Sequence, residues 1–131
     1  MAFDAGPYQA QILDHYKHPR NRGTLDRATH VAHQSNPLCG DAISLMLRVD
    51  GSDRIEEARF DGEGCAISMA SASLLTDALK GKTLGEAEVF DRTEVLRSLG
   101  VRLSAVREQC ALLVLRTLHT ALAGPSTAQG H

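Results

Sequence analysis

The clearest pattern along the chain is an alternation of apolar and polar residues that begins at Asp41. Every second residue there is apolar, at positions Ile43, Leu45, Leu47 and Val49. A period of two is expected of a strand with one buried face. The segment "IEEARFDGEG" continues as a second strand, with Ala58 and Phe60 on one face. Residues 41 to 61 are therefore predicted to form an antiparallel β-hairpin that reverses at Asp50-Gly51.

After the hairpin the apolar spacing changes to three or four residues, which is typical of helices. One helix is predicted to begin at or just after Cys65 and to stop at Gly81. One or two short helices follow in "TLGEAEVFDRTEVLRSLG". A long closing helix, capped by Ser104, follows in "RLSAVREQCALLVLRTLHTAL". Its expected apolar stripe consists of Leu103, Val106, Cys110, Leu113 and Thr117.

The N-terminal part is predicted to hold one helix and one strand. The helix begins near Pro7, places Tyr8, Ile12 and Tyr16 on one face, and stops before Pro19. "THVAHQ" is expected to form a short edge strand. The fold class is thus α+β, with a small three-stranded antiparallel sheet. The length of 131 residues suits a single domain over residues 1–123, and the small polar residues 124–131 are expected to form a disordered tail.

Composition excludes several functional classes. Lys and Arg number 14 against 16 Asp and Glu, a net charge of -2, so no nucleic-acid partner is expected. No apolar run reaches the roughly 18 to 20 residues of a membrane span, and "MAFDAGPYQA" lacks the features of a secretion signal. The protein is therefore expected to be cytoplasmic, without a membrane partner.

The three cysteines, Cys39, Cys65 and Cys110, are the main candidates for chemistry. Three cysteines cannot all pair with one another, and the expected reducing compartment disfavours disulfides. Each has a simpler explanation, because a free cysteine often packs as a small hydrophobe, as Cys110 would on its apolar stripe. Asp41 after a glycine could be only a turn residue. Taken singly, these positions do not distinguish a metal site from ordinary packing.

Taken together, the positions favour a metal site. The two ends of the hairpin bring Cys39, Asp41 and Cys65 close in space, and Cys110 on the closing helix can complete a tetrahedral set of three sulfurs and one oxygen. Such a set suits Zn²⁺ or iron in an iron–sulfur cluster. Arg107, one turn before Cys110, can offset part of the negative charge.

Two further groups of residues bear on this hypothesis. Glycines accompany the ligands in the loops, at Gly40, Gly62 and Gly64. None of the six histidines shows ligand spacing with another, so they are interpreted as surface or structural residues. They are His15, His18, His30, His33, His119 and His131.

Four motifs resemble those of the IscU/SufU/NifU N-terminal family of iron–sulfur cluster assembly proteins. In chain order they are "DHYKHPRNRG", "NPLCGD", "GEGCAISMASASLLTDALKGK" and "REQCALLVLRTL". The resemblance runs from about Tyr8 to Leu122. It implies that Cys39, Asp41, Cys65 and Cys110 are the ligands of zinc or of a 2Fe–2S cluster, and that a small antiparallel sheet packs against helices.

The resemblance also separates two subtypes. Gln109 stands where IscU-type members have a histidine, whereas "GCAISMASAS" and Arg107 are similar to the SufU type. The insert that SufU members carry between the second and third cysteines is missing, as is the proline before the last cysteine, where Ser104 and Ala105 stand.

Two functions follow from the resemblance. The first is a scaffold, not itself an enzyme in the ordinary sense, which accepts sulfur from a cysteine desulfurase, assembles a 2Fe–2S cluster and passes it to apo iron–sulfur acceptor proteins. The alternative is a zinc-dependent sulfurtransferase that relays persulfide sulfur from a SufS-like desulfurase. Cys39 is the expected sulfur acceptor, Cys110 is the alternative, and Arg107 supports either. A purely structural zinc domain is the third hypothesis.

Overall fold

The computed structural model describes residues 7–37 and 40–123. In these residues the sheet has three antiparallel strands in the order β1-β2-β3, as predicted. Strand β1 spans His30–Asn36, β2 spans Asp41–Val49 and β3 spans Ile55–Glu63. Leu45 in the central strand pairs with Ala32 on one side and with Phe60 on the other. The alternating apolar residues of β2 and β3 therefore share one face of the sheet.

The reversal between β2 and β3 is longer than the predicted pair Asp50-Gly51. It occupies residues 50–54, and its shape is set by the Asp50 carboxylate, which accepts hydrogen bonds from the amides of Ser52 and Arg54 at 2.8 and 3.1 Å. Asp53 adopts a left-handed conformation, with φ of 61°. The prediction was right about where the strand ends, but the turn is built by an aspartate side chain.

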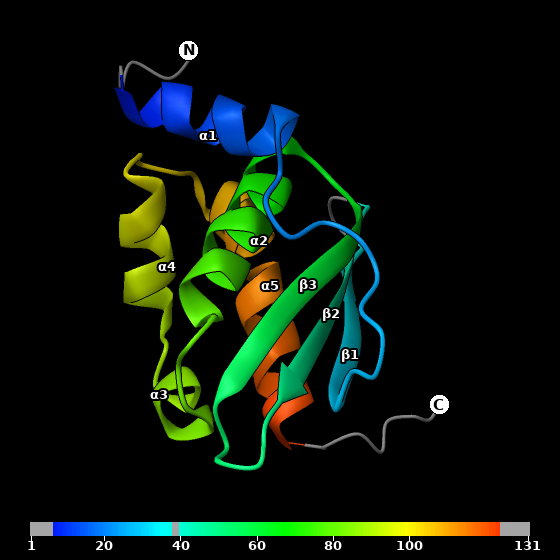
Figure 1. Ribbon diagram of the computed structural model, residues 1–131. Helices are drawn as coiled ribbons and strands as arrows, with labels where there is room; N and C mark the ends of the chain where they lie inside the picture. The colour runs from blue at the N-terminus through cyan, green and yellow to red at the C-terminus, as the bar shows by residue number, and fades with distance from the viewer. Residues whose placement is uncertain (1–6, 38–39, 124–131) are drawn as a thin grey trace.

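Within the described residues, five helices complete the fold. They are α1 (Pro7–Lys17), α2 (Ala66–Leu79), α3 (Leu84–Glu88), α4 (Arg92–Leu99) and α5 (Ala105–Ala123). Helices α2 and α5 pack on one face of the sheet, and α1 and α4 lie against them on the outside (Figure 1). Helices α3 and α4 each begin with a capping box, at Thr83 and Asp91, which explains why this segment forms two short helices.

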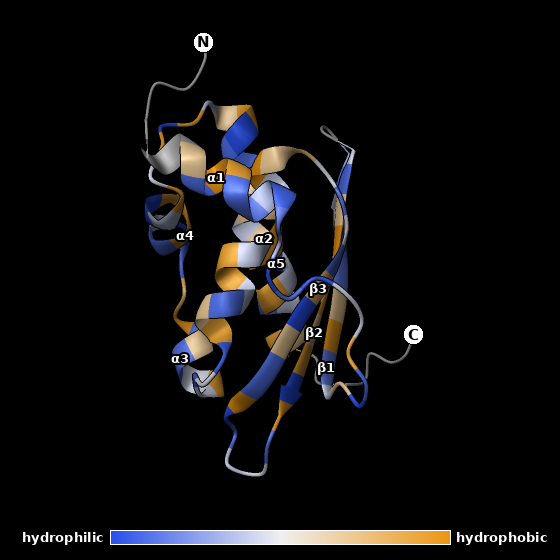
Figure 2. Ribbon diagram, turned by 45° about the horizontal axis from the view of Figure 1, so that its top comes forward, coloured by the Kyte–Doolittle hydropathy of each residue, from blue (hydrophilic) through white to orange (hydrophobic). Residues whose placement is uncertain are grey.

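The main core lies between the sheet and helices α2 and α5. Its largest fully buried side chains include Phe60, Leu45, Leu47, Leu79 and Leu113. Figure 2 shows the apolar residues concentrated on these helices and on the strands beside them. The packing of the sheet against helices, which the family resemblance implied, is thus observed.

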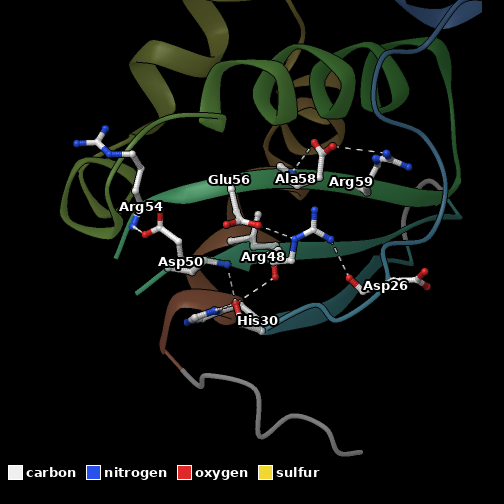
Figure 3. A network of polar contacts seen from close by, with 12 residues as sticks. Asp26, His30, Arg48, Asp50, Arg54, Glu56, Ala58 and Arg59 are labelled. Atoms are coloured by element: carbon white, nitrogen blue, oxygen red, sulfur yellow. Dashed lines mark hydrogen bonds and ion pairs between the residues drawn. The ribbon is translucent and has the colours of Figure 1, made fainter. Parts of the chain in front are cut away.

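The connector between α1 and β1 crosses the other face of the sheet. It first pairs with the free edge of β3, where the Gly23 amide donates to the Phe60 carbonyl at 2.8 Å. It then passes to the opposite edge, and Arg48 holds it by donating to the Asp26 carbonyl at 3.0 Å while also pairing with Glu56 (Figure 3). Met46 lies between the alternating apolar positions of β2, on this other face of the sheet, and its side chain is buried as well.

A second, smaller apolar cluster lies at the end of the molecule where α1, α2, α4 and α5 meet. Its buried members are Ile12, Ile67, Ala70, Leu99, Cys110 and Ala111, and Cys65 packs against it. Both described cysteines therefore belong to the same cluster, and α1 contributes Ile12 to it. This cluster fixes the surroundings of the two thiols.

Two predicted apolar positions are exposed. Val106 was expected in the buried stripe of the closing helix, but it is 55% exposed, because the first turn of α5 extends beyond the helices that cover the rest of it. Tyr16 was expected beside Ile12 on the packed face of α1, but it is 44% exposed, since His15 is the residue that bonds to α2. The predicted tail, residues 124–131, and the Tyr8 side chain lie outside the described part.

Candidate metal centre

Three of the four predicted ligands lie together in the structure. Asp41 is the first residue of β2, Cys65 immediately precedes α2, and Cys110 lies in the second turn of α5. One carboxylate oxygen of Asp41 and the sulfurs of Cys65 and Cys110 all lie within 4.8 Å of one another. Asp41 and Cys110 are buried, at 2% and 1% exposure, and Cys65 is half-buried. Cys39 lies outside the described residues, two positions before Asp41 in the chain.

The pairing of β2 with β3 brings Asp41 and Cys65 together. Ala42 pairs with Glu63, so the start of β2 lies beside the segment that leads into α2. Gly62 permits this pairing, because its φ is 143° and a Cβ at this position would lie 2.1 Å from the Ala42 carbonyl oxygen. No other residue fits there without moving the strand.

Gly64 provides the space for the polar groups of the site. A Cβ at this position would lie 2.3 Å from the Ser68 hydroxyl and 2.9 Å from Oδ1 of Asp41. From the sequence, Gly64 was grouped with Gly40 and Gly62 as a glycine that lets the backbone turn sharply near the ligands, but its φ is not among the positive values. Its role is therefore steric: the missing side chain leaves room for the Asp41 carboxylate and the Ser68 hydroxyl.

Asp41 is tied directly to Cys65. Its Oδ1 accepts a hydrogen bond from the Cys65 amide at 3.2 Å, and its Oδ2 lies 3.9 Å from the Cys65 sulfur. The Cys65 side chain makes no capping bond to α2, which leaves the sulfur facing the carboxylate. The partial positive charge of the α2 N-terminus favours anionic groups here.

The donor set fits a tetrahedral thiophilic metal. With metal–sulfur bonds of about 2.3 Å, two ligand atoms of a tetrahedral zinc site are separated by about 3.8 Å. The three donor atoms lie within 4.8 Å of one another, so small side-chain rotations suffice to close the set. Two sulfurs and a carboxylate suit Zn²⁺ or iron, and the chain supplies Cys39 as a fourth candidate ligand.

Arg107 and Gln109 lie on the exposed start of α5. The Arg107 amide donates a hydrogen bond to the Ser104 hydroxyl oxygen at 3.3 Å, which agrees with the predicted cap. The Arg107 side chain makes no ion pair with any described residue. Gln109 accepts a hydrogen bond from Arg116 at 3.2 Å. No hydrogen bond or ion pair links the Arg107 side chain to the three described donors, and its supporting role stays a prediction.

The histidines of the described ranges are absent from the donor cluster. His15 and His33 are hydrogen-bonded to Ser73 and Ser44, and His119 contacts the Phe90 carbonyl. These contacts agree with their interpretation as surface or structural residues. His131 lies outside the described part of the chain. The residue that sequence reasoning missed is Ser68, which lies 3.8 Å from the Cys65 sulfur and whose only signal was its position one helical turn after a predicted ligand.

The sequence is similar to characterised iron–sulfur assembly proteins. The family model described as the NifU-like N-terminal domain matches residues 7–127. The zinc-dependent sulfurtransferase SufU of Bacillus subtilis is 52% identical over 90 residues, which cover 66% of this chain and 60% of that protein. The scaffold protein IscU of Haemophilus influenzae is 34% identical over 126 residues, covering 94% of this chain and 98% of that protein.

Solved structures show the same fold. A protein from Fervidobacterium islandicum described as an iron–sulfur cluster assembly scaffold for the SUF system superimposes with a TM-score of 0.73 at 32% identity, over 86% of this chain and 93% of that one. The N-terminal part of a NifU-like protein from Brucella abortus shares the fold with a TM-score of 0.71 at 18% identity, over 88% of this chain and 92% of that one. No helix within residues 7–37 and 40–123 has the length and apolar character needed to cross a bilayer.

Proposed function

The chain belongs to the NifU-like N-terminal domain family, and from this premise we propose that it is an iron–sulfur cluster assembly protein. It accepts sulfur from a cysteine desulfurase, holds a 2Fe–2S cluster while it is assembled, and transfers it to apo-acceptor proteins. The observation that carries the proposal is the set of Asp41, Cys65 and Cys110 donor atoms within 4.8 Å of one another. The scaffold names of relatives that match nearly the whole chain support it.

Four residues would hold the metal: Cys39, Asp41, Cys65 and Cys110. A bound zinc ion or iron cluster supplies a positive centre that keeps the thiols ionised. The protein positions these donors from three separate elements and excludes water from two of them, since Asp41 and Cys110 are buried. A carboxylate is a harder ligand than a thiolate and binds thiophilic metals less strongly. Asp41 therefore suits a site that must release its cargo.

Sulfur enters by thiol exchange. The Cys39 thiolate attacks the outer sulfur of the desulfurase persulfide, which forms a Cys39 persulfide and releases the desulfurase cysteine as a thiolate. The proton of the persulfide stays on the transferred sulfur, so no external oxidant or reductant is needed. In the chain, Cys39 lies between two exposed residues, Pro37 two positions before it and Gly40 directly after it, whereas Cys110 is 1% exposed. This difference favours Cys39 as the acceptor over Cys110.

A second candidate function is that of a zinc-dependent sulfurtransferase, in which Cys39 relays the sulfur and no cluster is built. It is supported by the 52% identity to the Bacillus protein of that name, although this match spans less than two thirds of that protein. In this case Cys39, Asp41, Cys65 and Cys110 would hold a resident zinc ion, whose positive charge would keep the Cys39 thiol ionised for a SufS-like desulfurase. Arg107, close in sequence to Cys110, would support the charge balance in both functions.

One experiment separates these functions. The purified protein is analysed for bound metal, tested for stimulation of a cysteine desulfurase, and then supplied with iron and cysteine. Visible cluster absorption, followed by activation of an apo-acceptor protein, is expected for the scaffold. Stimulation with zinc retained and no cluster would instead identify the sulfurtransferase. Bound zinc with neither activity would identify a structural zinc domain and reject the proposal. Cys39→Ser should abolish the stimulation, and full stimulation by this variant would reject Cys39 as acceptor.

A further inference from the structure

Ser68 is a fully buried hydroxyl beside the metal centre that the proposed function does not use. It lies in the first turn of α2, three residues after Cys65, and is 0% exposed. Its oxygen lies 3.0 Å from the Cys65 carbonyl oxygen and 3.8 Å from the Cys65 sulfur. The single hydroxyl proton can be donated to either acceptor but not to both.

The Cys65 carbonyl oxygen can lose the hydrogen bond from Ser68 at little cost, because a second donor bonds to it. The Met69 amide donates to the same Cys65 carbonyl oxygen at 3.1 Å. A hydrogen bond to an ionised acceptor is about twice as strong as one between neutral groups. Once the Cys65 sulfur is a thiolate, the Ser68 hydroxyl therefore forms a stronger hydrogen bond to the sulfur than to the carbonyl oxygen.

The space around Gly64 shows that the hydroxyl belongs to the site. A Cβ at this position would contact both the Ser68 oxygen, at 2.3 Å, and Oδ1 of Asp41, at 2.9 Å. The hydroxyl and the carboxylate thus lie on the same side of the Gly64 backbone. Both also contact the Cys65 sulfur, so two polar groups enclose it.

We propose that Ser68 is a positioning residue: it donates a hydrogen bond to the Cys65 thiolate and makes Cys65 the retained, unreactive ligand of the centre. The inference rests on the proposed function, because it requires a metal-bound thiolate at Cys65. A hydrogen bond that stabilises the charge of a thiolate lowers its basicity, and its nucleophilicity falls with basicity with a Brønsted slope of about 0.4–0.5. Sulfur exchange is thereby left to the other cysteines.

The test is the alkylation rate of each cysteine in the zinc-loaded protein. Iodoacetamide is added to the wild type and to Ser68→Ala, and tryptic peptides are quantified by mass spectrometry, since cleavage at Lys and Arg places the three cysteines in three different peptides. Loss of the hydrogen bond should speed alkylation of Cys65 by about three- to tenfold. Ser68→Thr keeps the hydroxyl and should return the rate to near that of the wild type.

Thr117→Val is the matched control. Thr117 is also a fully buried hydroxyl in a helix, but among the described residues its hydroxyl donates to the Leu113 carbonyl alone, at 2.8 Å. Its loss should leave the Cys65 rate unchanged. An equal rise in this variant would mean that loosened packing is the cause, and it would overturn the role of Ser68.

Three further outcomes also support or overturn the proposed role of Ser68. If zinc slows alkylation in the wild type but Ser68→Ala leaves the Cys65 rate unchanged, the role of Ser68 is overturned while the metal centre stands. If zinc protects none of the three cysteines, the metal centre itself is rejected, and the role of Ser68 with it. If Ser68→Ala does not retain zinc, the Ser68→Thr variant provides the test. A wild-type zinc content and a wild-type Cys65 alkylation rate in Ser68→Thr support the role of the hydroxyl. Loss of zinc from Ser68→Thr overturns that role.

Discussion

The Asp41 carboxylate faces two groups of Cys65 at once. Its Oδ1 accepts a hydrogen bond from the Cys65 amide at 3.2 Å, and its Oδ2 lies 3.9 Å from the Cys65 sulfur. The same side chain therefore holds the start of α2 in place and offers an oxygen to the donor set. Substitutions at this position should separate the two roles.

The structural role of Asp41 predicts different stabilities for two variants without metal. Asp41→Asn keeps a carbonyl oxygen for the Cys65 amide, whereas Asp41→Ala removes it and leaves a buried donor without this acceptor. We expect Asp41→Ala to unfold with a free energy about 1–3 kcal/mol lower than that of Asp41→Asn. Urea unfolding in the presence of a chelator measures the difference. Equal stabilities would show that the hydrogen bond contributes nothing.

The ligand role of Asp41 predicts slower release of the cluster from Asp41→Ala. Replacing the hard carboxylate leaves a centre held by sulfur donors alone, which bind iron more strongly. The measurement is the rate at which an apo-acceptor protein gains its cluster from preloaded protein. A transfer rate equal to that of the wild type would remove the argument that the carboxylate eases release.

Gly64→Ala should damage the metal centre without disturbing the backbone conformation. The added Cβ would lie 2.3 Å from the Ser68 hydroxyl and 3.0 Å from Cγ of Asp41, so both polar groups must move. We expect zinc affinity to fall about 10- to 100-fold, the usual effect of disturbing groups that orient metal ligands. Competition with a chromophoric chelator measures the affinity.

Gly51→Ala is the matched control for this substitution. A Cβ at position 51, in the loop between β2 and β3, would meet nothing within 4 Å. Its zinc affinity should equal that of the wild type. Similar losses in both variants would mean that the space around Gly64 has no special importance.

The sequence predicted the site through strand periodicity and the order of elements. Because Ile43, Leu45 and Leu47 alternate, β2 and β3 could be paired, and the pairing alone placed Asp41 near Cys65. The position of Cys65 before a helix followed from the change of period at Ile67. These inferences use local patterns, which short segments determine strongly.

Contacts between distant segments could not be predicted in this way. Met46 is buried because the connector after α1 crosses the sheet, and no periodicity within β2 encodes that crossing. Val106 fits a helical stripe but lies where α5 extends beyond its neighbours. The second contact of the Ser68 hydroxyl depends on the rotamer of Cys65, which the Asp41 side chain and the α2 N-terminus set together.

The contact between His15 and Ser73 predicts a loss of stability in mild acid. Burial, assisted by the charge of Arg20, lowers the pKa of His15, and Asp14 and Asp77 oppose this only in part. The pKa in the folded protein therefore lies below the unfolded value of 6.5, and the unfolded chain takes up the proton first as the pH falls. Stability should decrease as the pH falls through about 6.5 and should be unaffected by this residue well above it.

His15→Gln should flatten the pH dependence of stability as the pH falls through 6.5. Denaturant unfolding at several pH values measures the slope. Burial also lowers the pKa of His30, so part of the slope should remain. If His15→Gln and the wild type have the same slope, the buried imidazole does not contribute.

Metal removal should loosen the helical end of the molecule more than the sheet. Cys110 belongs to the buried cluster that also contains Ile12 of α1 and Leu99 of α4, with Cys65 packed against it. The core between the sheet and α5 consists of other residues, such as Phe60 and Leu113. A ligand that binds only the folded state adds about 2.7 kcal/mol to the free energy of unfolding when it is present at 100 times its dissociation constant. Chelation of the metal removes this stabilisation, and the effect should be largest near the donor residues.

Hydrogen exchange with and without a chelator tests this asymmetry. Amides of α1 and of the first turns of α2 and α5 should exchange faster after zinc is removed, while those of the paired strands β2 and β3 should change least. The Cys65→Ser and Cys110→Ser variants should show the same faster exchange in these helices even with zinc present, because each substitution removes a sulfur donor. Uniform acceleration over the whole chain would mean that the two clusters unfold as one unit. Faster exchange in the strands alone would contradict the link between the metal centre and α1.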